Sequence, residues 1–162
     1  MNTVNNLSEK QKMHHYMGIE MNIQIWNLLN NKNRSEQDGK RMVMFAKASL
    51  FHWKLSPKFQ PINEQRGEWM ISHVYSVLGN GKEALAHANK AWSLTKKHKF
   101  NDFDLAYAHE CLSRAYAASG NNLKCKSWYK KAEQCGDLIS DTKDKEIFFG
   151  DLNKDPWYDC LT

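Results

Sequence analysis

The sequence predicts an all-α fold built from antiparallel helical hairpins. Apolar side chains recur at helical spacing along the 162 residues, and no stretch of six residues alternates cleanly between apolar and polar. Proline and glycine are scarce, at 3 and 8 residues, whereas all-β folds use both heavily in their turns. An internal repeat, described below, points the same way. We expect one domain over residues 1–162 with about seven helices.

The first hairpin is expected over residues 8–54. Ser8 and Gln11 fit a capping box, in which the serine oxygen accepts a backbone amide and the glutamine side chain bonds back to the cap. Apolar residues then recur about one helical turn apart until a polar run ends the helix, and Ser35 caps the next one. Two prolines predict a connector over residues 55–63.

The rest of the chain predicts two more hairpins and a terminal helix. The hairpins are expected at residues 63–97 and 103–135, and the capping helix at 140–152. Gly79 and Gly120 are expected to end the first helix of their hairpins, because glycine readily adopts the left-handed conformation that closes a helix. Residues 155–162 are interpreted as a tail.

The chain matches itself when it is shifted by 41 residues. The identical pairs are Ser72 and Ser113, Tyr75 and Tyr116, Gly79 and Gly120, Asn80 and Asn121, Lys90 and Lys131, and Ala91 and Ala132. The serine lets two helices approach closely, the tyrosine fills the next layer, and the glycine stops the first helix. The alanine late in the second helix leaves room for a neighbouring side chain. These are the positions that a repeated helix–turn–helix unit requires.

This pattern resembles the tetratricopeptide repeat over residues 65–94 and 106–135. The resemblance implies helical hairpins stacked as a short right-handed superhelix, whose concave face binds a peptide or another ligand. The chain departs from the family in its repeat length, since a standard repeat has about 34 residues. Glu68 and His109 stand where the family has an early tryptophan, and no proline closes either unit. The chain is therefore similar to a divergent member.

The resemblance also implies which residues line the concave face. The first helix of each hairpin faces inward, and the end of the preceding helix is expected near the opening of the concave face. The candidate binding residues are His52, Trp53, Arg66, Trp69, His73, Ser76, Tyr107, Glu110 and Arg114. Guanidinium groups match planar anions, and aromatic rings supply rigid contact area. In the alternative, Arg66 pairs with Glu68 or Glu110. Trp69 then belongs to the core.

The sequence contains no catalytic signature, which favours a binding protein over an enzyme. His109 and Glu110 begin a pattern like that of zinc proteases, but Ser113 stands where the second histidine is needed. The glycines at 79 and 81 follow a helix and not a strand, so they do not form a phosphate-binding loop. We expect no catalytic residues, no metal site and no cofactor.

The cysteines and the N-terminal residues indicate in which cellular compartment the protein is expected. Cys111, Cys125, Cys135 and Cys160 include no CxxC motif and are not spaced like a disulfide framework. They are predicted to be free thiols, with Cys111 and Cys125 packed in the interior of a protein in a reducing compartment. Residues 1–12 lack a secretory signal, and no apolar run could span a membrane. The cytoplasm is the expected location.

The leading hypothesis is a non-catalytic scaffold that binds a protein or peptide partner, or a second copy of itself. The alternative is a sensor or enzyme for a small anionic ligand, in which His73 and Glu110 exchange protons. Its pocket would be lined by Arg66, His73, Tyr107, Glu110 and Arg114. Nucleic acid is disfavoured, although the net charge is +5, because aromatic residues are not interleaved with the lysines of residues 96–99 and 124–131.

Overall fold

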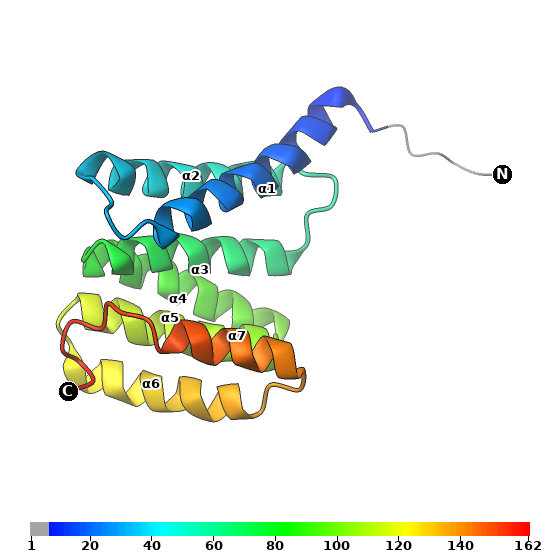
Figure 1. Ribbon diagram of the computed structural model, residues 1–162. Coiled ribbons are helices and arrows are strands. Elements are labelled where there is room, and N and C mark those ends of the chain that lie inside the picture. The colour runs from blue at the N-terminus through cyan, green and yellow to red at the C-terminus, as the bar shows by residue number, and fades with distance from the viewer. Residues whose placement is uncertain (1–6) are drawn as a thin grey trace. The chain divides into compact units, whose positions relative to one another are not determined.

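The computed structural model describes residues 7–162, and every regular element in that range is an α-helix (Figure 1). The helices are α1 (Glu9–Asn30), α2 (Glu36–Lys54), α3 (Pro61–Val77), α4 (Gly81–His98), α5 (Asp102–Ala118), α6 (Asn122–Asp137) and α7 (Thr142–Leu152). The all-α prediction with seven helices is confirmed for the described residues. Residues 1–6, part of the stretch in which no secretory signal is expected, lie outside them.

The chain forms two compact units, unit 1 (Met1–Gly67) and unit 2 (Glu68–Thr162), which are described separately. In unit 1, α1 and α2 form the expected antiparallel hairpin, and both helices begin with a capping box. The Ser8 hydroxyl accepts from the Gln11 amide at 3.2 Å, and the Gln11 side chain accepts from the Ser8 amide at 2.9 Å. These local signals fix where the helices start.

Unit 1 is held together where α1 and α2 approach closely. A methyl group on Gly18 would lie 3.0 Å from the Trp53 ring, so only glycine leaves room for the tryptophan there. The Ser49 hydroxyl donates to the Gly18 carbonyl at 2.7 Å. The buried apolar side chains of the two helices are Ile25, Met42, Ala46 and Leu50.

Helix α3 begins at Pro61, two residues before the expected start. Proline fits the first turn of a helix, because the backbone amide that it lacks would have no partner there and its fixed φ is already helical. The predicted connector over residues 55–63 is therefore too long, since Pro61 starts the helix instead of ending the loop.

The 41-residue repeat of the sequence is also a repeat of contacts. The Ser72 hydroxyl donates to the Ala84 carbonyl at 2.8 Å, and the Ser113 hydroxyl donates to the Cys125 carbonyl at 2.9 Å. Each serine thus links the two helices of its own hairpin at the same position. The small side chain at this position lets the two backbones approach closely.

The turns inside the two hairpins are also equivalent. Gly79 and Gly120 both have a φ of 76°, a conformation that residues with a Cβ rarely adopt. The amides of Asn80 and Asn121 each donate at 2.9 Å, to the carbonyls of Tyr75 and Tyr116 respectively. Each asparagine side chain then caps the next helix. The two tyrosines therefore end their helices in the same way, as the internal repeat predicts.

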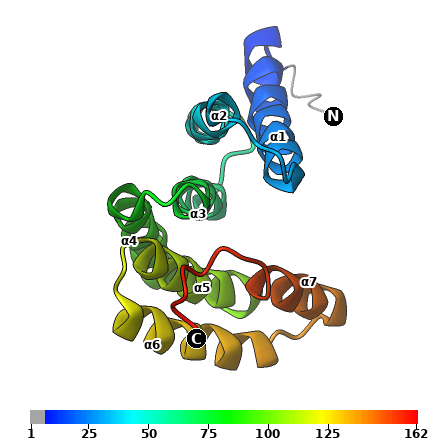
Figure 2. The same cartoon turned by 60° about the vertical axis from the view of Figure 1, so that its left-hand side comes forward.

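The tail segment, residues 153–162, folds back onto unit 2 after α7. It was expected to be a simple tail, but Trp157 is only 6% exposed and Cys160 is fully buried. Both belong to the apolar core of unit 2. Figure 2 shows the segment leaving α7, passing α5 and ending beside α6. It is an integral part of the unit.

A disulfide joins Cys125 of α6 to Cys160 of the tail segment. The prediction of free thiols is therefore wrong for these two cysteines, and Cys125 is not a free packing thiol. It is right for Cys111 and Cys135. The two sulfur atoms come together only because the tail segment folds back, and the separation of 35 residues in the sequence gives no sign of this. The expected cytoplasmic location rested in part on free thiols, and the Cys125–Cys160 disulfide removes that support.

Within residues 7–162, no helix combines the length and the apolar character that crossing a membrane would require.

We predict that Gly81→Ala destabilises the fold by about 1–3 kcal/mol, the usual effect of overpacking. A methyl group at this position would lie 2.4 Å from the backbone nitrogen of Ser119, which cannot move aside as a side chain can. Urea unfolding measures the effect. The control is Gly150→Ala in α7, where nothing lies within 4 Å, and helix propensity should stabilise by about 1 kcal/mol. Equal effects of the two substitutions would contradict the close contact.

Candidate functional site

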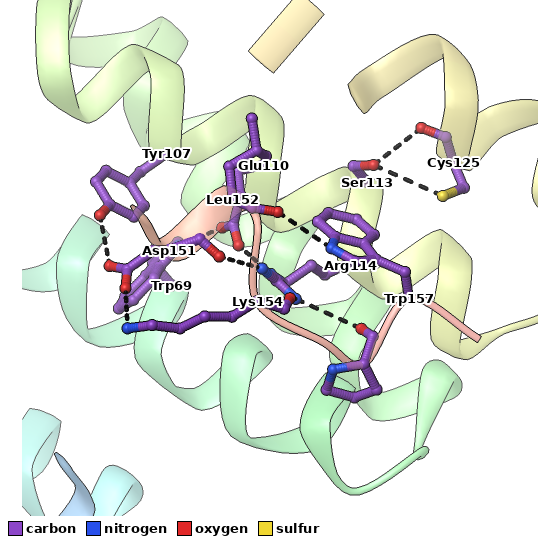
Figure 3. Close-up of polar contacts among 11 residues, drawn as sticks. Trp69, Tyr107, Glu110, Ser113, Arg114, Cys125, Asp151, Leu152, Lys154 and Trp157 are labelled. Carbon is purple, nitrogen blue, oxygen red and sulfur yellow. Dashed lines mark hydrogen bonds and ion pairs between the residues drawn. The ribbon is translucent and has the colours of Figure 1, made fainter. Parts of the chain in front are cut away.

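Six of the nine candidate residues lie in unit 2, on two helices of the repeated hairpins. Trp69, His73 and Ser76 are on α3, and Tyr107, Glu110 and Arg114 are on α5. Within each helix they are three or four residues apart, which places them on one face. Figure 3 shows that the side chains of Trp69, Tyr107, Glu110 and Arg114 gather around the end of α7 and the start of the tail segment.

A buried ion pair lies at the centre of this cluster. Glu110 is 1% exposed and Arg114 is 2% exposed, and the Arg114 Nε donates to a carboxylate oxygen of Glu110. The other carboxylate oxygen accepts from the Trp69 indole at 3.1 Å. Trp69 and Glu110 are 41 residues apart, so they occupy equivalent positions of the two repeats. The repeat itself thus brings the indole to the carboxylate.

Arg114 uses its remaining nitrogen atoms to hold backbone carbonyls. One terminal nitrogen donates to the Asp151 carbonyl at 2.7 Å, where α7 ends. The other donates to the carbonyls of Lys154 at 3.1 Å and Pro156 at 3.4 Å. The guanidinium carbon also lies 4.1 Å from the centroid of the Trp157 ring. A cation suits the C-terminal end of a helix and the face of an indole.

Tyr107 anchors the end of α7 through its hydroxyl group. It donates to a carboxylate oxygen of Asp151 at 2.7 Å, and Lys154 forms an ion pair of 2.7 Å with the other oxygen. Burial, followed by the bond to the Asp151 carboxylate, raises the pKa of Tyr107 far above its usual value. The phenol therefore stays protonated and acts as a donor.

His73 and Ser76 lie on α3 in the same unit. The His73 ring stacks on Trp69 with 5.1 Å between the centroids. Burial, followed by the charges of Arg114 and Lys154, lowers the pKa of His73 to about 3, so its ring is neutral near pH 7. A neutral histidine weakens the hypothesis that it exchanges protons with Glu110. Ser76 contributes its backbone, because its carbonyl accepts from the Tyr158 hydroxyl at 2.6 Å.

The tail segment packs against residues of three helices. We name this contact surface the tail groove and define it by Ser76 of α3, Arg114 of α5, and Cys125 and Tyr129 of α6. Trp157 fills it, with its ring edge-on to Tyr129 at 5.0 Å. The face that the sequence analysis proposed for a peptide therefore already holds a non-helical segment of the same chain.

The other three candidates belong to unit 1. His52 Nδ1 lies 2.8 Å from His14 Nδ1, and burial followed by the His14 charge lowers the pKa of His52. Trp53 packs against Gly18, and its ring is edge-on to that of His15. Arg66 is exposed, near the C-terminal boundary of this unit. His52 and Trp53 thus have structural contacts within the α1–α2 hairpin.

Sequence reasoning missed the residues that complete the cluster. These are Asp151, Lys154, Trp157, Tyr158 and Cys160. One signal was present, since two adjacent aromatic residues and a cysteine are unusual in a short solvent-exposed tail. They indicate a segment that packs onto the rest of the protein. Their partners could not be read from local patterns.

Cys135 and His109 form a second cluster, with 3.3 Å between the sulfur and Nδ1. This is the separation of a nucleophile and its base. Burial, however, raises the pKa of the Cys135 thiol, and burial is also the main cause that lowers the pKa of His109. Both groups are therefore neutral and the thiol is not activated. Cys135 lines a shallow pocket of about 290 Å³ with Asn101, Asp102, Leu105 and Leu138.

Comparison of the chain with protein-family models, with curated proteins and with solved structures finds no match. The search of residues 7–162 for three or more His, Cys, Asp or Glu side chains able to hold one metal ion also finds none. Functional inference therefore depends on the contacts of the tail groove.

We predict that Arg114→Ala lowers the free energy of unfolding by about 3–5 kcal/mol, because it leaves a buried carboxylate at Glu110 without its cation. Urea unfolding measures the loss. The control is Lys154→Ala, whose ion pair is largely exposed and should contribute no more than about 1 kcal/mol. A small loss for Arg114→Ala would show that the carboxylate is hydrated or protonated at little cost.

We predict a pH dependence of stability from His73. Its pKa is about 3 in the folded protein, against 6.5 for an ordinary histidine. Between these values the unfolded chain binds a proton that the folded chain does not. The free energy of unfolding should therefore fall as pH falls, by up to about 1.4 kcal/mol per pH unit.

The control for this prediction is His73→Gln, which removes the titrating ring and retains the carboxylates that also titrate in this range. The difference between the two proteins, measured by urea unfolding from pH 7 to pH 4, isolates the histidine. If the free energy of unfolding changes with pH in the same way for both proteins, the His73 ring is not buried as a neutral imidazole.

Proposed function

We propose that the protein is a non-catalytic scaffold that binds a non-helical segment of a partner protein in the tail groove. The observation that carries the proposal is the pair of bonds from Arg114 to the carbonyls of Lys154 and Pro156 in the tail segment. Every peptide has backbone carbonyls, so these bonds recognise a chain whatever its side chains. The stacked indole adds selectivity for an aromatic residue.

The charge balance of the groove favours a peptide over a small anion. The guanidinium of Arg114 is already paired with the Glu110 carboxylate, and both are buried. A ligand that brings another negative charge finds no unmatched cation there, whereas neutral carbonyls complete the hydrogen bonds of the arginine. A neutral peptide segment therefore fits the tail groove better than a small anion does.

The repeated hairpins support the same proposal. Their resemblance to tetratricopeptide repeats implies that the first helices, α3 and α5, line a concave binding face. The tail segment touches both of these helices, at Ser76 and Arg114. We therefore include a short superhelical arrangement of hairpins in the proposal, with another protein or a second copy of this chain as the partner.

The test is selection of peptides from a random display library on the full chain carrying Cys160→Ser. We expect enriched peptides that contain an aromatic residue. In NMR spectra of the labelled protein they should shift the Arg114 Nε–H signal and the amides near Ser76. The control is the same titration with a peptide in which the aromatic residue is replaced by alanine. The proposal is wrong if no peptide is enriched, or if the enriched peptides shift only unit 1 or the residues around Cys135.

A further inference from the structure

The tail segment is the resident occupant of the tail groove, and one covalent bond ties it there. We infer that the Cys125–Cys160 disulfide is a redox latch on this groove. A dithiol reductant opens the latch and makes the groove available to a partner segment with the chemistry of Pro156, Trp157 and Tyr158. This inference rests on the proposed function and adds to it a class of ligand and a means of control.

The contacts of the tail segment define that ligand. Arg114 requires two carbonyls placed as those of Lys154 and Pro156 are. The indole of Trp157 lies on the guanidinium. The Tyr158 hydroxyl donates to the Ser76 carbonyl at 2.6 Å and lies 3.2 Å from the Val77 carbonyl. A proline–tryptophan–tyrosine sequence satisfies these contacts when the residue two positions before the proline places its carbonyl as Lys154 does.

The backbone near the end of the segment is in an unfavourable conformation. Tyr158 and Asp159 have φ values of 51° and 56°, a conformation that residues other than glycine adopt only at a cost. Beyond them, Lys126 donates to the Thr162 carbonyl at 2.9 Å and the Thr162 hydroxyl donates to the Asp159 carbonyl at 2.6 Å, and both bonds are exposed. The Cys160 sulfur lies 4.0 Å from the Asn122 carbonyl. The disulfide therefore holds residues 158–160 in place against an unfavourable backbone conformation.

The opening step is thiol–disulfide exchange. A thiolate of the dithiol attacks the Cys160 sulfur, a mixed disulfide forms, and Cys125 leaves as a thiolate that takes up a proton. The second thiol of the reductant then displaces Cys160 and closes a cyclic disulfide. Two electrons and two protons pass to the protein, which gains two thiols. Both cysteines are buried, so a local opening of the tail segment must precede the attack.

The latch acts on the fraction of molecules whose groove is open. The apparent dissociation constant of a partner is its intrinsic value divided by this fraction. With the disulfide intact the fraction is very small. After reduction the segment remains attached to α7 and competes from a high effective concentration, so the groove opens only in part. Removing a further contact between the tail segment and the groove should then increase the binding of the partner again.

The experiment measures the binding of a fluorescein-labelled peptide to full-length protein by fluorescence polarisation. The peptide has the sequence of residues 153–162 with Cys160→Ser. The proteins compared are the oxidised wild type, the wild type in dithiothreitol, Cys160→Ser, and Tyr158→Phe combined with Cys160→Ser. The matched control is Cys135→Ser, the same change at a cysteine that forms no disulfide. Circular dichroism checks that each protein is folded.

We expect Cys160→Ser and the reduced wild type to bind at least ten times more tightly than the oxidised wild type and Cys135→Ser. The double variant should bind more tightly still. A peptide with Trp157→Ala should not bind any of them. Hydrogen exchange gives an independent readout, because the Cys160 amide donates to the Trp157 carbonyl at 2.9 Å and should lose protection on reduction.

The possible failures are distinguishable. If the oxidised wild type binds as tightly as Cys160→Ser, the latch is overturned and the peptide-binding function stands. If library-selected peptides bind in the groove and this peptide does not, the ligand chemistry is overturned. If no peptide binds even to the folded double variant, the proposed function and this inference both fail.

Discussion

The buried ion pair between Glu110 and Arg114 determines where the tail segment packs in unit 2. Removing two charges from water is costly, and the cost is recovered only when the remaining donors and acceptors are satisfied. Glu110 is satisfied by Arg114 and the Trp69 indole. Arg114 still needs acceptors, and it finds them in three backbone carbonyls at the end of α7 and beyond. The tail segment must therefore return to α5 before the pair is complete.

The repeat supplies the frame in which this pair can form. The hydroxyls of Ser72 and Ser113 hold the two hairpins in the same internal geometry, so α3 and α5 present equivalent faces. One indole and one carboxylate at matching positions then meet directly. Arg114 follows Glu110 by four residues on the same helix and lies beside it. The polar site therefore lies where the two copies of the repeat differ, with Trp69 matching Glu110 and His73 matching Arg114.

The sequence predicted what depends on neighbours along the chain and missed what depends on distant ones. Capping serines and glycine stops act within four residues, so the helix ends that carry them were accurate. The start of α3 was not, because Pro61 begins the helix, and α6 ends and α7 begins two residues later than expected. Trp69, Glu110 and Arg114 were candidates from the sequence and are in direct contact in the structure, while their place on a concave binding face stays a prediction. The tail segment that covers them was not predicted, because Cys160 pairs with a residue 35 positions away. Nothing local to a cysteine indicates its partner.

The costly polar core of unit 2 has a rationale if its occupant can leave. Replacing a buried ion pair with well-packed apolar side chains is often neutral or stabilising, so Glu110 and Arg114 are not the simplest way to hold a permanent tail. An apolar core gains stability from the area it buries, and it forms no hydrogen bonds that select a particular backbone conformation. The Arg114 guanidinium donates hydrogen bonds to carbonyls and packs on the face of an indole. It can therefore bind any segment that supplies both groups. It also keeps a charged partner when that segment departs, since the Glu110 carboxylate remains beside it.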